Sequence, residues 1–189
     1  MSRVYRIKVR ESLRKVVRAS DHVRTQVELL DLLPAAQMAQ LLAAELERRG
    51  FQRQGDQAVR TTDGVQVTVD VASGEVTVQA AASRAINLVD DNTGWTPQAR
   101  GPVARRVEKQ LREELKKTLA NRAGERKEQL QEEVTNKLEA HLGDLRKELD
   151  QAVNRVTAEA LKRKAAQLGT IKQVTEDPQS GSMTIVLEV

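Results

Sequence analysis

The stretch between Gly101 and Gly169 constrains this chain most, because it has the composition of one long, highly charged helix. Residues 102–168 carry 16 Lys/Arg and 12 Asp/Glu, which is the whole net charge of +4. Acid-before-base pairs at i, i+4 stabilise exposed helix faces. Such pairs are Glu108/Arg112, Glu113/Lys117, Glu133/Lys137 and Glu159/Arg163. The pattern predicts a long charged helical arm over 102–168, which would reach about 100 Å if unbroken.

An apolar stripe runs along the second half of this arm and ends at Ala160. Its members are spaced 4-4-3-4-4-3-4, an eleven-residue repeat that keeps a stripe almost straight along a helix. Such a stripe needs a partner surface, in a coiled coil or in a helical hairpin. The predicted interaction residues are therefore Val134, Leu138, Leu142, Leu145, Leu149, Val153 and Val156.

Two glycines bear on the shape of the arm. Gly124 follows a helical stretch and could turn the chain into a helical hairpin, whereas the stripe continues in phase through Gly143. Both forms stay open at this point, a hairpin bent near Gly124 and an uninterrupted helix.

The N-terminal residues have strand patterns. Residues 4–9 are a β-branched run, residues 12–19 are a weaker candidate, and residues 23–29 alternate strictly between apolar or Thr and polar side chains. We predict a hairpin with its turn near 20–22. A continuous helix over 11–33 is the alternative, but it would scatter these apolar side chains around its circumference.

A helix is predicted over 34–49. Pro34 suits the first helical position, and Gly50 supplies a left-handed stop that lets Phe51 pack back on the helix. The side chains at helical spacing are Met38, Leu41, Leu42, Glu45 and Leu46. This amphipathic helix should lie on a sheet.

A meander of three strands is predicted over 58–62, 65–71 and 75–80. Asp63-Gly64 is a strong two-residue hairpin signal, because the turn needs positive φ, and Ser73-Gly74 marks the second turn. Beyond it, residues 86–89 could form another strand or an apolar tether.

The rest of the chain completes an α+β fold with an antiparallel sheet of hairpins and one packed helix. Residues 1–89 form the predicted body and residues 90–101 a loop, from the Asp/Asn/Thr/Gly/Pro composition. Residues 102–168 are the arm. Residues 170–189 should form a hairpin around the turn at 176–181, docked on the body sheet.

Recognisable catalytic equipment is missing from the sequence. Without cysteine there is no disulfide or thiolate metal site. His22 and His141 are the only histidines, too few for a closed metal site. Asp90-Asp91 is the only site-like stretch, and such clusters more often mark ordinary turns. We expect no enzyme, no catalytic residues, no cofactor and no metal.

The sequence also suggests a location. No apolar run follows the basic residues at 1–6, and none approaches the ~20 residues that cross a bilayer. We therefore expect a cytoplasmic protein that does not enter the membrane.

Three stretches resemble a known group of proteins. They are Asp-Gly-Val-Gln-Val-Thr-Val-Asp at 63–70, Gly-Glu-Val-Thr-Val at 74–78 and Glu-Asp-Pro-Gln-Ser-Gly-Ser-Met-Thr-Ile at 176–185. The β portions, about half of the chain, look like bacterial accessory proteins of AAA+ ATPase ternary systems. The resemblance implies an accessory or adaptor protein that works with an ATPase, and it carries over no catalytic residue.

Two hypotheses follow. The first is a non-enzymatic interaction or scaffold protein whose arm binds a second copy or a protein partner such as an AAA+ ATPase, with Trp95 as a cap on the core or a contact anchor. The second is a nucleic-acid-binding protein, which would use the basic residues of the N-terminal hairpin and the helix faces around Lys162-Arg163-Lys164.

Overall fold

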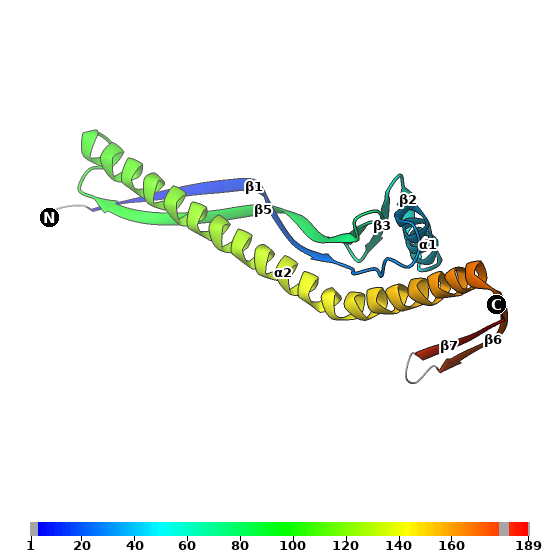
Figure 1. Cartoon of the computed structure of the whole chain (residues 1–189). Coiled ribbons are helices and arrows are strands. Elements are labelled where there is room, and N and C mark those ends of the chain that lie inside the picture. Colours follow the sequence, from blue (N-terminus) through cyan, green and yellow to red (C-terminus); the bar gives the residue numbers. More distant parts are fainter. Residues whose placement is uncertain (1–3, 178–181, 189) are drawn as a thin grey trace. The chain divides into compact units, whose positions relative to one another are not determined.

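The computed structural model describes residues 4–177 and 182–188, so residues 1–3, residues 178–181 of the predicted turn at 176–181, and Val189 lie outside the described residues. The elements are β1 (Tyr5–Gln26), α1 (Ala35–Arg48), β2 (Gln52–Gln54), β3 (Gln57–Thr62), β4 (Val65–Asp70), β5 (Glu75–Thr96), α2 (Pro102–Leu168), β6 (Thr170–Asp177) and β7 (Ser182–Glu188). Figure 1 labels all of them except β4. An antiparallel sheet, a short helix and a long helix confirm the predicted α+β class.

The chain divides into two compact units. The first unit combines residues 1–20 with 81–135, and the second combines 21–80 with 136–189. The three longest elements, β1, β5 and α2, contribute residues to both units. Each unit is described by itself below.

The five-stranded sheet has the order β1-β5-β4-β3-β2. The turn between β3 and β4 confirms the predicted hairpin, because Asp63 and Gly64 have φ of 52° and 76° and Thr62 pairs with Val65. Positive φ at both central residues is what a two-residue turn needs to follow the twist of the strands. The predicted alternation in the middle strand is also confirmed, since Val65, Val67 and Val69 are all buried.

Helix α1 confirms the prediction over 34–49 to within one residue at each end. Pro34 precedes its first residue, and Gly50 has a φ of 85°. The Phe51 N–H donates to the Leu46 carbonyl oxygen at 3.1 Å, and the Phe51 side chain is buried. The apolar face of α1 is therefore closed at its C-terminal end by the residue after the glycine.

The predicted N-terminal hairpin is wrong, because β1 is one strand of 22 residues. Residues 20–22 lack the positive φ that a tight reversal requires; among the described non-glycine residues, only Asp63 has it. Alternation instead continues along the strand, so that Ile7, Val9, Val17 and Ala19 are at least partly buried on one face. The opposite face of β1 is exposed.

The predicted loop over 90–101 is also wrong for most of its length. Strand β5 continues to Thr96, so the predicted strand over 86–89 is only its middle. Gly94 explains how a turn-forming residue fits a strand here. A Cβ on Gly94 would lie 3.0 Å from the side chains of Val107 and Leu111, so the glycine permits close approach of α2 in the first unit.

Helix α2 has the predicted bounds and no break at Gly124 or Gly143. The helical hairpin bent near Gly124 is therefore not formed. A Cβ at either glycine would meet nothing within 4 Å, so no packing constraint forces a bend.

Strands β6 and β7 form the predicted C-terminal hairpin, with a register that runs from Thr170↔Glu188 to Asp177↔Ser182. They make a two-stranded sheet of their own and are not strands of the five-stranded sheet. Among the described helices, none is both long and apolar enough to cross a membrane.

Candidate interaction surfaces

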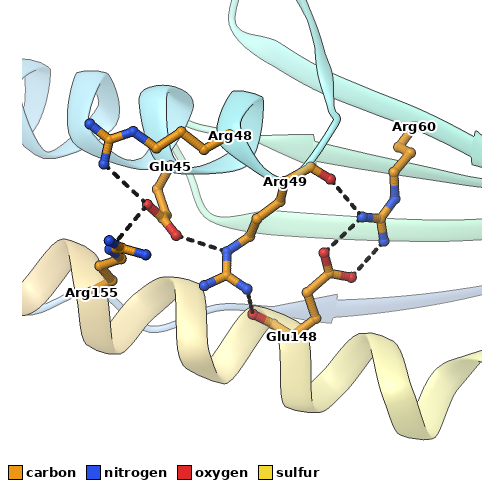
Figure 2. A network of polar contacts seen from close by, with 6 residues as sticks. All are labelled: Glu45, Arg48, Arg49, Arg60, Glu148 and Arg155. Atoms are coloured by element: carbon orange, nitrogen blue, oxygen red, sulfur yellow. Dashed lines mark hydrogen bonds and ion pairs between the residues drawn. The ribbon is translucent and has the colours of Figure 1, made fainter.

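In the second unit, a bidentate ion pair joins β3 to α2. Arg60 donates through Nη1 and Nη2 to the two carboxylate oxygens of Glu148, at 2.7 and 2.6 Å (Figure 2). Arg60 Nη1 also donates to the Arg49 carbonyl oxygen at 3.0 Å, and the guanidinium lies 4.4 Å from the centroid of the Phe51 ring. Both charged side chains are about a quarter exposed, so solvent screens this pair less than it screens a surface pair.

Glu45 is the second carboxylate of this network, and its side chain is only 5% exposed. Arg49 Nε donates to its Oε1 at 2.8 Å, while Arg48 and Arg155 lie at 3.6 and 3.8 Å from its Oε2. That Oε2 accepts no hydrogen bond. Arg49 also donates to the Glu148 carbonyl oxygen at 3.3 Å, which links the two carboxylates into one network (Figure 2).

This network can hold elements together, and its bidentate pair Arg60–Glu148 is poorly suited to proton transfer near neutral pH. The hydrogen bonds from Arg60 lower the pKa of Glu148, and Glu148 raises the pKa of Arg60. A group suited to proton transfer has a pKa near the working pH. We therefore interpret the network as a clamp that joins α1, β3 and α2 within the second unit.

A cleft of about 310 Å³ lies beside the clamp, between α1 and α2 of the second unit. Its charged lining residues are Glu45, Arg48, Arg155, Glu159, Lys162 and Arg163. The Lys162-Arg163-Lys164 cluster of the sequence thus contributes two side chains to this cleft, and Arg163 lies 3.4 Å from Glu159.

The apolar stripe of α2 is largely covered within the chain. Five of the predicted interaction residues are buried, Val134, Leu138, Leu145, Leu149 and Val156, and two are intermediate, Leu142 and Val153. In the second unit, Leu142, Leu145 and Leu149 line one cavity together with Val23 and Val78. The stripe therefore has an intramolecular partner, and self-association through it stays a prediction.

In the first unit, β1 and α2 share an apolar core. Val9 is buried against Leu111 and Leu115, and Ile7 and Val107 pack around them. The residues that predicted a loop are paired at its margin. Asp90 lies 3.0 Å from Arg122 of α2, the Asn92 side chain donates to Glu114 at 3.4 Å, and Asp91 lies 2.9 Å from Lys8.

The opposite face of β1 in the first unit carries a row of basic side chains, which we call the basic face. It consists of Arg6, Lys8, Arg10, Arg14 and Arg18, all exposed. They occupy even positions of the strand, whereas Val9, Val17 and Ala19 at odd positions are buried. Only Lys8 of this row has an ion pair within the part of the chain that the structure describes.

Trp95 lies on β5 and is 64% exposed, so it does not cap the core and remains available as a contact anchor. The two histidines lie on different elements, β1 and α2. The exposed His22 lies in β1, and His141 Nδ1 lies 2.9 Å from the Lys137 carbonyl oxygen. Among the described residues, no group of three or more His, Cys, Asp or Glu side chains could hold a metal ion.

Sequence reasoning missed the clamp, and it marked the basic N-terminal residues as a possible nucleic-acid contact without placing them on one face of a single strand. The pair Arg60–Glu148 joins residues 88 apart, and no local pattern marks it. One signal of the clamp was present in the sequence. Glu45 occupies a position on the apolar face of α1, and a carboxylate that is buried there requires polar partners. The basic face could have been found only by extending the alternation of 4–9 through Val16-Val17.

Comparison with known protein families matches residues 1–189 to the FtsH ternary system domain X5. Searches of curated proteins and of solved structures found no match.

Proposed function

Because this chain belongs to the FtsH ternary system domain X5 family, we propose that it is a non-enzymatic accessory protein that binds an AAA+ ATPase of the FtsH type. The observation that carries the proposal is the family match over the whole chain. The matched family is an accessory domain of AAA+ (FtsH) ternary systems. A cytoplasmic location remains part of the proposal.

The structure supports a role through surfaces. The apolar stripe of α2 is used inside the chain, which leaves mainly charged faces and scattered apolar side chains outside. In the second unit, the clamp joins arginines to the carboxylates of Glu45 and Glu148, an arrangement suited to fixing geometry. An accessory protein needs a stable scaffold with exposed binding faces, and these two features supply one.

The test is direct binding of the full chain to the AAA+ ATPase of the same ternary system. Size-exclusion chromatography of the mixture should give a complex, and the rate of ATP hydrolysis should change when the chain is added. Separate elution together with an unchanged rate would refute the proposal. The ATPase alone and the chain alone serve as references, and the chain alone should hydrolyse no ATP.

Nucleic-acid binding is the second candidate function, because the basic face presents four arginines and a lysine in one row. Binding to phosphates would fall steeply with salt concentration. A single-stranded oligonucleotide that is not retained at low salt would eliminate this candidate.

A further inference from the structure

The basic face lies on a strand with a free edge. Strand β1 is the first strand in the sheet order, so among the described residues only β5 pairs with it. In the first unit, about half of its backbone N–H and C=O groups therefore point away from any strand. Native edges of this length are usually shortened, bulged or covered, because an open edge pairs with other chains. Strand β1 has 22 residues, of which residues 5–20 belong to the first unit.

The charges on this face are unbalanced, and all of them lie at even positions of the strand. The sequence alternates through Arg6, Lys8 and Arg10 and continues with Arg14 and Arg18. Side chains on one face of a strand repeat about every 6.8 Å. By the same alternation, the matching face of β5 carries Asp91 as its acidic residue, and Asp91 already pairs with Lys8. Among the described residues, the four arginines of this face therefore have no ion-pair partner.

An extended acidic segment satisfies both features at once. Added as a strand beside β1, it would pair its backbone with the open edge, and its alternate side chains would lie on the basic face at the same spacing. Carboxylates at those positions would meet guanidinium groups, which bind carboxylates with two parallel hydrogen bonds.

A protein segment fits this face better than a nucleic acid does. Nucleic acid offers no backbone donors and acceptors in strand register, and single strands are bound by stacking on several aromatic rings. The exposed large hydrophobic side chains that the alternation places on this face are instead Val16, Val89 and Trp95, with one ring among them. Scattered apolar side chains and a Trp are typical of protein contacts.

We propose that the free edge of β1 and the basic face bind an extended acidic segment of a partner protein as an added strand. The inference rests on the proposed accessory function and names the chemistry by which the partner is held.

The probe is a labelled peptide of about ten residues that alternates Glu and Thr. Fluorescence anisotropy with the full chain should show saturable binding that weakens as salt is raised. A second peptide, in which every Thr is replaced by Pro, keeps the charge and cannot form a strand. It should bind at least roughly tenfold more weakly, equivalent to about 1.4 kcal/mol.

Variants of the chain locate the site. Arg10→Glu/Arg14→Glu should weaken peptide binding roughly tenfold or more, since two attractions become repulsions. The matched control Arg105→Glu/Arg106→Glu makes the same charge change at exposed positions of α2 in the first unit and should bind as the wild type does. A Lys/Thr peptide should bind Arg10→Glu/Arg14→Glu better than it binds the wild type. Circular dichroism confirms that both variants are folded.

Three results would overturn the inference. They are an absence of saturable binding at about 1 mM peptide, equal binding of the Pro-containing peptide, and binding of an oligothymidine in place of the peptide. An ATPase complex that survives Arg10→Glu/Arg14→Glu would also overturn it while leaving the proposed function intact. If neither the wild type nor either variant forms a complex with the ATPase, the proposed function is refuted instead.

Discussion

At Glu148, one residue of α2 holds the side chain of Arg60 in β3 and that of Arg49, the residue after α1. Its carboxylate accepts two hydrogen bonds from Arg60, and its carbonyl oxygen accepts one from Arg49. Breaking a charged pair of this kind leaves the remaining guanidinium partly buried without its carboxylate, which costs more than the pair itself contributes. The clamp is therefore sensitive to change at either partner.

Replacing Glu148 with Gln should lower the free energy of unfolding by about 1–3 kcal/mol, because Arg60 loses its ionised partner. Urea denaturation followed by circular dichroism measures the change. The control Glu139→Gln removes an exposed carboxylate of α2 in the same unit and should change stability by less than about 0.5 kcal/mol. Equal effects of the two substitutions would show that the clamp contributes nothing.

The same pair gives a pH dependence. The hydrogen bonds from Arg60 lower the pKa of Glu148 in the folded chain, below its ordinary value of 4.5. The unfolded chain therefore binds the proton more readily, so this stabilisation is present above about pH 5 and is lost as the pH falls through the lowered pKa. The difference in unfolding free energy between wild type and Glu148→Gln should shrink from pH 7 to about pH 3.5. A difference that stays constant over this range would contradict the assignment.

At the scale of elements, a glycine in a turn and a glycine inside a helix have different roles. Gly74 has a φ of 76°, and a Cβ there would lie 2.5 Å from the carbonyl oxygen of Val27. Gly124 and Gly143 lie in α2, where a Cβ would meet nothing within 4 Å. The first glycine is required by its surroundings, and the other two only reduce helix propensity.

Alanine substitutions should therefore have opposite signs. Gly124→Ala and Gly143→Ala should each raise the free energy of unfolding by about 0.5–1 kcal/mol, because alanine is the better helix former. Gly74→Ala should lower it by about 1–3 kcal/mol, because positive φ and the backbone contact both oppose a side chain. Chemical denaturation measures all three. Destabilisation by Gly124→Ala would indicate a bend that α2 does not show.

Elements with local signals could be predicted from the sequence. The Asp63-Gly64 turn, α1 and both ends of α2 follow from turn chemistry, capping glycines and charge pairing. The length of β1 and β5 could not be predicted, because Asp90, Asp91 and Asn92 have the composition of a turn. Their partners, Arg122, Lys8 and Glu114, come from distant parts of the chain, and only the folded first unit brings them together.

The candidate surfaces were predicted less well than the elements. The stripe of α2 was predicted to need a partner, but a helical pattern does not say whether that partner is another chain or other elements of the same chain. Leu138 and Val156 are buried within the second unit, so the partner of the stripe lies in the same chain. The clamp depends on contacts across 88 residues, which no periodicity encodes.

On the scale of the whole molecule, two units share three continuous elements and one family match. Each unit contributes a different feature to the account. The second unit has the clamp and a covered helical stripe, and the first has an open strand with the basic face. This combination suits an accessory protein, which needs a stable scaffold and an exposed edge that can bind a partner.

The most direct test of this account is sedimentation velocity of the full chain mixed with the AAA+ ATPase of its ternary system. The account predicts a faster-sedimenting complex that contains both proteins, that forms with Arg105→Glu/Arg106→Glu and that is weakened roughly tenfold or more by Arg10→Glu/Arg14→Glu. Independent sedimentation of the wild-type chain and the ATPase at concentrations of tens of micromolar would contradict the proposal that the chain binds this ATPase.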